Sequence, residues 1–260
     1  MQQDDGVDKV SKSILITGAT SAIGRALAVH YATHGYSLHL HGRNGELLEQ
    51  VAAQCSAIGA KVQSYSLDLL DTDNVVAWLQ QLLNDHSLDL FIANAGINTN
   101  IGKDLGGESI TEMQTLLDLN VKATLLTTAL VAKHMQANGR GQIALMSSLA
   151  GYYGLPKTPS YCASKAAVKS YGESLRGWLA PFGVQVSVIM PGYVQSPMCN
   201  AMPGPKLFKL QPEQAAVRIA KGLKKNKARI SFPFPLNFGT WWLSILPASL
   251  SQFILSKIGY

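Results

Sequence analysis

Tyr161 and Lys165 are the residues whose types and spacing point most directly to chemistry. They frame the run Tyr-Cys-Ala-Ser-Lys in a segment with helical character. Side chains four residues apart lie on one face of a helix, so the Lys165 ammonium can reach the Tyr161 hydroxyl. A phenol has a pKa of about 10, and a nearby cation lowers that pKa by stabilising the phenolate. The pair indicates proton transfer. Tyrosine and lysine also share many solvated helix faces, so the interpretation depends on the other motifs in the chain.

A glycine-containing turn near the amino terminus has the composition of a phosphate-binding site. The run Thr-Gly-Ala-Thr-Ser-Ala-Ile-Gly covers residues 17–24, between a strand-like apolar segment and a helical pattern. Gly18 and Gly24 lack a Cβ, which lets the chain turn sharply and lets backbone N–H groups approach a pyrophosphate at the positive end of a helix. An ordinary tight turn is the alternative, but the place between strand and helix favours dinucleotide binding.

These motifs and two others resemble those of the short-chain dehydrogenase/reductase (SDR) family over about residues 14–196. The turn at 17–24 resembles the TGxxxGxG pattern with Ala22 at the middle glycine, and the tyrosine and lysine form the YxxxK pair. Residues 93–96 resemble NNAG with alanine first, and residues 191–196 resemble PGxVxT with serine last. The resemblance implies an oxidoreductase that uses a nicotinamide cofactor to interconvert a carbonyl and a secondary alcohol.

The resemblance implies catalytic roles for Asn120, Ser148, Tyr161 and Lys165. Ser148 precedes Tyr161 at the family's spacing and is preferred to the adjacent Ser147 for that reason. In the implied mechanism Tyr161 donates the proton, Ser148 orients the carbonyl, and Lys165 holds the ribose and tunes Tyr161. Asn120 matches the family's fourth catalytic position, where it maintains a water chain. An asparagine within a helix is otherwise unfavourable because its amide competes with the backbone.

The predicted cofactor is NADP(H) in preference to NAD(H). An acidic residue after the second strand would bond the ribose 2′-hydroxyl of NAD(H), but Gly42 stands there and Arg43 offers a guanidinium to a 2′-phosphate. A solvated loop arginine is the alternative. Asp68 resembles the family's adenine-contacting aspartate, or it caps a turn. The predicted cofactor-binding residues are Gly18, Thr20, Ser21, Ala22, Ile23, Gly24, Arg43, Asp68, Leu69, Asn94, Ala95, Gly96, Tyr161, Lys165, Pro191, Gly192, Val194 and Ser196.

Short apolar runs alternate with helical patterns, which predicts an α/β fold with a parallel sheet. Strands are expected at 13–17, 37–41, 62–67, 88–93, 142–147, 184–190 and 229–232. Helices are expected at 22–34, 46–58, 73–84, 109–136, 160–179 and 212–224, the fourth opening with a capping box of Ser109 and Glu112. The continuous alternation indicates one domain over residues 1–260. Family likeness implies a Rossmann-like doubly wound sheet of about seven strands with helices on both faces, and a homo-dimer or homo-tetramer.

Composition indicates a folded protein, and its three cysteines without paired spacing fit a reducing cytoplasm. The chain of 260 residues is 47% hydrophobic and 15% charged, which is typical of globular proteins. Its net charge of +6 suits phosphate-bearing ligands or an anionic membrane, and no nucleic acid partner is expected because the lysines at 221–229 lack aromatic stacking partners. No cysteine or histidine spacing predicts a disulfide framework or a metal site. Residues 1–12 are expected to form a flexible tail and no signal or anchor.

Residues 197–260 are predicted to form a substrate lid followed by an apolar C-terminal extension. Residues 197–210 hold three prolines and few helix signals, as a mobile lid or a plain surface loop would. Residues 230–256 contain no charged residue or histidine, and their prolines and serines argue against a continuous spanning helix.

An amphipathic helix is expected at the end of this extension. Its expected apolar face holds Leu250, Phe253, Ile254 and Ile258, and the opposite face holds Ser251, Gln252 and Lys257. This apolar face has three possible destinations, which the sequence leaves open: a subunit interface, the active site, or a membrane surface beside the lysines at 221–229, which would make the protein membrane-associated.

The expected substrate is an apolar ketone or aldehyde, lipid-like or steroid-like, because the extension is apolar. Candidate pocket walls are Tyr152, Tyr153, Leu155 and Met198. A small 3-hydroxy-acid or sugar-alcohol dehydrogenase is the second enzyme hypothesis. A non-catalytic dinucleotide-binding sensor is the alternative from another class, and the presence of all four catalytic residue types argues against it.

Overall fold

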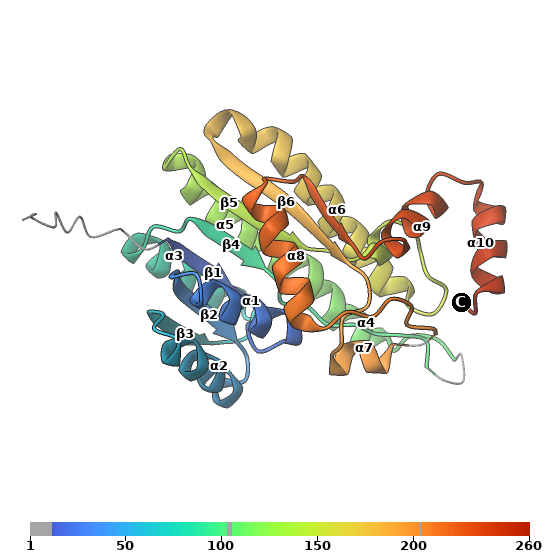
Figure 1. Ribbon diagram of the computed structural model, residues 1–260, viewed down its shortest axis with the longest axis horizontal. Helices are drawn as coiled ribbons and strands as arrows, with labels where there is room; N and C mark the ends of the chain where they lie inside the picture. Colours follow the sequence, from blue (N-terminus) through green and yellow to red (C-terminus); the bar gives the residue numbers. More distant parts are fainter. Residues whose placement is uncertain (1–11, 103–105, 203) are drawn as a thin grey trace, which may run out of the picture.

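A seven-stranded parallel sheet lies at the centre of the computed structural model, which describes residues 12–102, 106–202 and 204–260 (Figure 1). Its strands are β1 (Ser13–Ile16), β2 (Ser37–Gly42), β3 (Val62–Ser66), β4 (Leu90–Ala93), β5 (Gly141–Met146), β6 (Val184–Pro191) and β7 (Arg229–Phe232). The order β3-β2-β1-β4-β5-β6-β7 reverses between β1 and β4, which opens a crevice at the carboxyl ends of the strands. The predicted Rossmann-like doubly wound fold is confirmed. The predicted tail at 1–12 lies outside the described residues apart from Lys12.

Helices cover both faces of the sheet because successive strand residues point to opposite sides. The helices are α1 (Ala22–Ala32), α2 (Gly45–Ala57), α3 (Thr72–Asp85), α4 (Ile110–Leu117), α5 (Thr124–Ala137), α6 (Pro159–Leu179), α7 (Pro197–Ala201), α8 (Pro212–Lys224), α9 (Leu236–Leu243) and α10 (Ala248–Lys257). In β1, Ile14 and Ile16 join the core with α1, α2 and α8, whereas Leu15 joins the core with α3, α5 and α6. The sheet is therefore buried on both sides.

The predicted single helix at 109–136 contains a change of helical type. The π-helical segment Asp118–Ala123 separates α4 from α5 and includes Asn120. The Ser109 side chain accepts a hydrogen bond from the Glu112 N–H, which is one of the two bonds of the predicted capping box. The Glu112 carboxylate instead accepts a hydrogen bond from the Thr99 hydroxyl. By length and hydropathy alone the combined helix Ile110–Ala137 is long enough to cross a membrane. Burial of its α5 half against the sheet accounts for that apolar character.

The chain after β6 departs furthest from its predicted structure. The segment at 197–210 was expected to lack a helix, but it begins with α7, which Ser196 caps by accepting the Cys199 N–H at 3.0 Å. In α10 the expected polar residue Ser251 is fully buried, whereas Leu250 and Phe253 are 44% and 58% exposed. The reason is a contact with α9, because the Ser251 hydroxyl donates to the Leu243 carbonyl at 2.8 Å.

Candidate active site

Asn94, at the end of β4, holds the turn between β1 and α1 in shape. Its side-chain amide donates to the carbonyls of Thr17 at 3.0 Å and Gly18 at 2.9 Å and to the Ser21 hydroxyl at 3.1 Å. Its backbone N–H donates to the Thr17 hydroxyl at 3.1 Å. Because β4 lies beside β1, these bonds join the two strands at the point where the sheet order reverses.

Two glycines in this turn occupy positions that admit no side chain. Gly18 has a φ of +65°, and a Cβ there would lie 2.8 Å from the Ala95 Cα. A Cβ on Gly24 would lie 2.2 Å from the Gly18 carbonyl oxygen. The close approach leaves the N-terminus of α1 beside the cavity, where the N–H groups of its first turn and its positive dipole fit a pyrophosphate. The residues present therefore suit a dinucleotide, and Ala22 at the usual middle glycine stands at the first position of α1.

His41, in β2, hydrogen-bonds the turn between β1 and α1, which the sequence did not predict. The Gly18 N–H donates to its Nδ1 at 3.4 Å, so its Nε2 carries the hydrogen that reaches the Leu67 carbonyl at 3.1 Å. Burial lowers the pKa of His41 to about 4, which keeps the ring neutral. The alternation of His39 and His41 along the strand predicts only ordinary packing. The residues next to His41 in the sequence do not reveal that its side chain contacts the turn at Gly18.

The residues expected to choose the cofactor lie outside the main cavity. A Cβ on Gly42 would approach Thr20 Cγ2 to 2.9 Å, while Arg43 beside it is exposed. Asp68 accepts from the Leu70 N–H at 3.0 Å, as a turn cap does. Leu69 is buried in the core on the α3 side of the sheet.

Ser148, Tyr161 and Lys165 meet in one buried group. Their exposed fractions are 9%, 7% and 5%. The Lys165 Nζ lies 5.6 Å from the centroid of the Tyr161 ring and donates to the Met146 carbonyl at 3.0 Å. The two adjacent serines differ, because the Ser147 hydroxyl donates to the Lys165 carbonyl at 2.7 Å whereas the Ser148 hydroxyl donates to the Pro191 carbonyl at 3.4 Å.

Burial dominates the titration of this group. It raises the pKa of Tyr161 to about 12, against a smaller opposing effect of the Ser148 hydrogen bond. It also lowers the pKa of Lys165 to about 8. For the protein side chains by themselves, loss of solvent therefore decides the direction of both pKa shifts. Tyr161 stays protonated at neutral pH, which suits a proton donor.

Asn120 lies behind the group and does not line the cavity. It is fully buried, and its side chain accepts from the Ile97 N–H and donates to the Ile97 carbonyl, both at 2.8 Å. It also donates to the Ser164 hydroxyl at 3.1 Å, and that hydroxyl donates to the Tyr161 carbonyl at 2.7 Å. Asn120 thus connects the loop after β4 to the first turn of α6.

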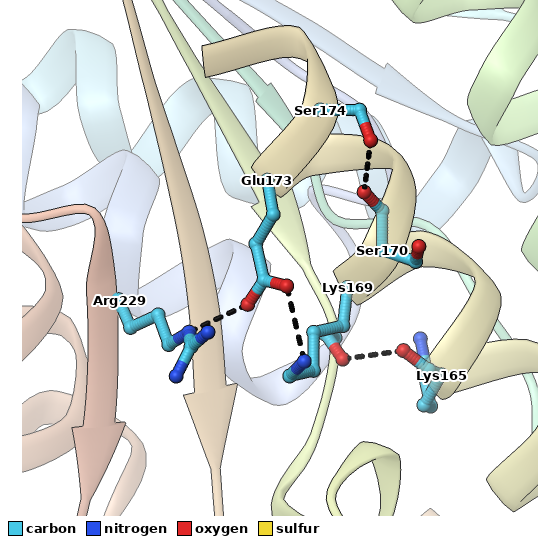
Figure 2. Close-up of polar contacts among 7 residues, drawn as sticks. Lys165, Lys169, Ser170, Glu173, Ser174 and Arg229 are labelled. Carbon is cyan, nitrogen blue, oxygen red and sulfur yellow. Dashed lines mark hydrogen bonds and ion pairs between the residues drawn. The ribbon is translucent and has the colours of Figure 1, made fainter. Parts of the chain in front are cut away.

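Two carboxylates hold α6 in place, and neither was predicted. Glu108 accepts from the Ser160 N–H at 3.2 Å and from the Ser160 hydroxyl, which caps the helix immediately before Tyr161. Glu173 accepts from Lys169 Nζ at 3.1 Å and from Arg229 Nε at 2.5 Å, which ties the helix to β7 (Figure 2). The partners of both carboxylates include residues distant in sequence, so the motifs carried no signal for them.

A cavity of about 590 Å³ runs from the phosphate turn past this group to the C-terminal helices. Predicted site residues that line it are Thr20, Ser21, Ala22, Ile23, Asn94, Gly96, Ser148, Tyr161, Lys165, Pro191, Gly192, Val194 and Ser196. Gly18, Gly24, Arg43, Asp68, Leu69, Ala95 and Asn120 are not part of its lining. Of the expected walls, Leu155 and Met198 line it, but Tyr152 and Tyr153 line a neighbouring hollow.

The C-terminal helices form the wall that the sequence left undecided. The inner side of α9 contributes Leu236, Gly239, Thr240 and Leu243, which recur at helical spacing. Ile254 and Leu255 of α10 join them, and Tyr260 hydrogen-bonds the Pro205 carbonyl at 3.0 Å and the Tyr193 hydroxyl.

The short chain dehydrogenase family model matches residues 12–204. The chain belongs to this family. As a short-chain dehydrogenase it is similar to an "Uncharacterized oxidoreductase" of Myxococcus xanthus, with 33% identity over 241 residues, 92% of this chain and 94% of that protein. Estradiol 17-beta-dehydrogenase 11 of Homo sapiens is 27% identical over 254 residues, 94% of this chain and 82% of that protein.

A solved structure shares the fold of this short-chain dehydrogenase. The short-chain dehydrogenase from Sphingobium yanoikuyae in complex with NADPH matches with a TM-score of 0.79 and 23% identity, over 95% of this chain and 96% of that chain. The comparisons confirm the predicted oxidoreductase family and the Rossmann-like fold.

Proposed function

We propose that this short-chain dehydrogenase uses NADPH to reduce an apolar ketone or aldehyde to the alcohol. The supporting observation is the position of Ser148, Tyr161 and Lys165 at the side of a cavity that is otherwise mostly apolar. The relative that acts on estradiol, by its name, favours a bulky apolar substrate. Among the described residues that line the cavity, Lys165 is the only charged one. This argues against a 3-hydroxy acid, which would need a further cation for its carboxylate.

The three buried residues divide the work on the carbonyl. A bound NADPH supplies the hydride. The Ser148 hydroxyl donates a hydrogen bond to the carbonyl oxygen, and the Tyr161 hydroxyl transfers its proton to that oxygen. Lys165, with its pKa lowered to about 8, remains largely protonated at neutral pH and favours the tyrosinate that is left behind. Asn120 positions Tyr161 through Ser164, and the N-terminus of α1 receives the pyrophosphate.

Arg43 is the proposed determinant for the 2′-phosphate. Gly42 leaves no carboxylate to repel that group, and the exposed guanidinium can turn toward it without breaking a described side-chain bond. Small residues at Gly42 and Thr20 keep the end of β2 close to the phosphate turn.

Cofactor and substrate are tested by NADPH oxidation with a series of ketones and aldehydes of rising apolar size, beside the same assays with NADH. We expect kcat/KM to rise with apolar size and to favour NADPH. Arg43→Gln should lower kcat/KM for NADPH about 10- to 100-fold, since a charge-assisted hydrogen bond is lost, and leave NADH unchanged. Arg140→Gln is the matched control, because this exposed arginine bonds only Ser87 among the described contacts. Equal use of both cofactors by the wild type would contradict the proposal.

A further inference from the structure

The two C-terminal helices turn apolar side chains outward as well as inward. At one end of the molecule, α9 and α10 stand away from the sheet (Figure 1). We define the C-terminal apolar surface as Phe234, Phe238, Trp241, Trp242, Ile245, Leu250, Phe253 and Ile258, each between 37% and 79% exposed. Phe238, Trp241 and Trp242 form one aromatic cluster, with ring centroids 5.7 to 6.2 Å apart. A patch of this kind marks an interaction site.

Part of this surface also lines the active-site cavity. Trp242 and Ile258 line the cavity, yet they are 45% and 46% exposed. Leu207 also lines it and is 47% exposed, and its neighbour Phe208 is 53% exposed. Residues that are both lining and exposed define the rim of an opening. Trp242, Ile258 and Leu207 are all apolar, so an apolar molecule meets no charged side chain among these rim residues.

Lysines lie close to this part of the rim. Residues 214–260 contain no Asp or Glu. Lys157 donates to the Gly259 carbonyl at 2.9 Å, and Lys257 lies 5.4 Å from the Phe253 ring centroid. Lys206 follows Pro205, whose carbonyl bonds Tyr260. The lysines at 221–227 precede β7, whereas α9 follows it, so these lysines are not counted among the charges near the rim.

We propose that the C-terminal apolar surface docks on an anionic phospholipid membrane, so that the cavity receives its apolar carbonyl substrate directly from the lipid. The substrate part rests on the proposed function, whereas the docking part does not. Exposed tryptophans and phenylalanines bordered by lysines are typical of surfaces that insert among lipid headgroups. A second copy of this chain is a poorer occupant, because pairing this surface with itself would bring Lys206 and Lys257 against like charges with no carboxylate from residues 214–260.

The test is flotation of the full chain with vesicles of phosphatidylcholine alone or with roughly 30% phosphatidylserine. We expect the wild type to float with the anionic vesicles and at least several-fold less with the neutral ones, with binding that falls as salt rises. The double variant Phe238→Ser, Phe253→Ser should lose flotation. The control variant Leu47→Ser, Trp178→Ser removes side chains of 46% and 59% exposure from α2 and α6 and should float like the wild type.

Each outcome has a definite meaning. A wild type that stays unbound, or a control that loses binding as fully as the double variant, overturns the docking proposal. An oligomer that the double variant dissociates, without vesicle binding by the wild type, assigns the surface to a second copy and also overturns it. Thermal melting and NADPH binding verify that each variant is folded.

The docking proposal and the proposed function fail separately. Flotation needs no turnover, so a chain that floats but reduces no carbonyl supports docking and refutes the reductase. A chain that reduces soluble carbonyls but does not float supports the reductase and refutes docking. Where both hold, anionic vesicles should lower the KM for a membrane-dissolved ketone several-fold in the wild type and leave that of the double variant unchanged.

Discussion

The active-site cavity has two walls that are built differently. The wall from residues 12–196 consists of strand ends and buried polar groups, each held by several hydrogen bonds, as Asn94 and Asn120 are. The wall from residues 197–260 consists of apolar helices joined by a few contacts, such as Ser251 to Leu243 and Tyr260 to Pro205. The first wall holds its polar side chains in place through many hydrogen bonds. The second wall is an apolar surface whose rearrangement would break few hydrogen bonds.

The two walls should also differ in rigidity. In the first, a Cβ on Gly24 would meet the Gly18 carbonyl oxygen at 2.2 Å, so the backbone is packed to its limit. In the second, α10 buries only Ser251 and Leu255. Sparse burial permits local opening without global unfolding. We therefore expect the second wall to open locally more readily than the first.

The largest expected contrast is between two tyrosines on opposite walls. Tyr161→Phe should lower kcat about 10³-fold while the protein still binds NADPH, because the proton donor is lost and the ring is kept. Tyr260→Phe should change kcat less than about threefold, because its hydroxyl only holds the extension. Steady-state kinetics and NADPH fluorescence titration measure both. Near wild-type turnover by the first variant would refute the assignment of Tyr161.

A second contrast concerns stability. Leu145→Ala, in β5, should lower the free energy of unfolding by about 2–5 kcal/mol, because it leaves a void in a closed core. Leu255→Ala should lower it by less than about 1 kcal/mol, since α10 can open alone, but should speed amide exchange in α10. Denaturant melts and hydrogen exchange distinguish the two effects. Equal losses in global stability would show that both walls unfold as one unit.

The smallest expected effect is a dependence of stability on pH. Burial lowers the pKa values of His39 and His41 from 6.5 to about 4. The unfolded chain binds these protons at higher pH than the folded chain, so stability is complete above pH 6.5 and is lost as the pH falls toward 4. The Tm should drop by several degrees between pH 7 and pH 5. His39→Gln combined with His41→Gln should flatten this slope, and an unchanged wild-type Tm would contradict the account.

The predicted strands and helices from residue 13 to 191 agree with the structure to within a few residues, because hydrophobic periodicity is local. Periodicity also predicts that Ser251 lies on the exposed face of the last helix, and this prediction is wrong. Periodicity shows which residues share a face of a helix, but not which other element that face packs against. Tyr152 and Tyr153 were misplaced for a related reason, because nearness to Ser148 in the chain does not fix the side of the cavity. Arg43, Asp68 and the catalytic roles remain predictions.

The sequence by itself determined what depends on spacing: a tyrosine and a lysine on one helical face, a turn that only glycine can make, and strands that alternate with helices. Tertiary structure alone decided what depends on residues far apart in the chain. It placed His41 under the phosphate turn, Glu108 at the start of α6, and the C-terminal helices along the cavity. It also set the pKa shifts of Tyr161 and Lys165, because the cost of desolvating a charge depends on everything packed around it.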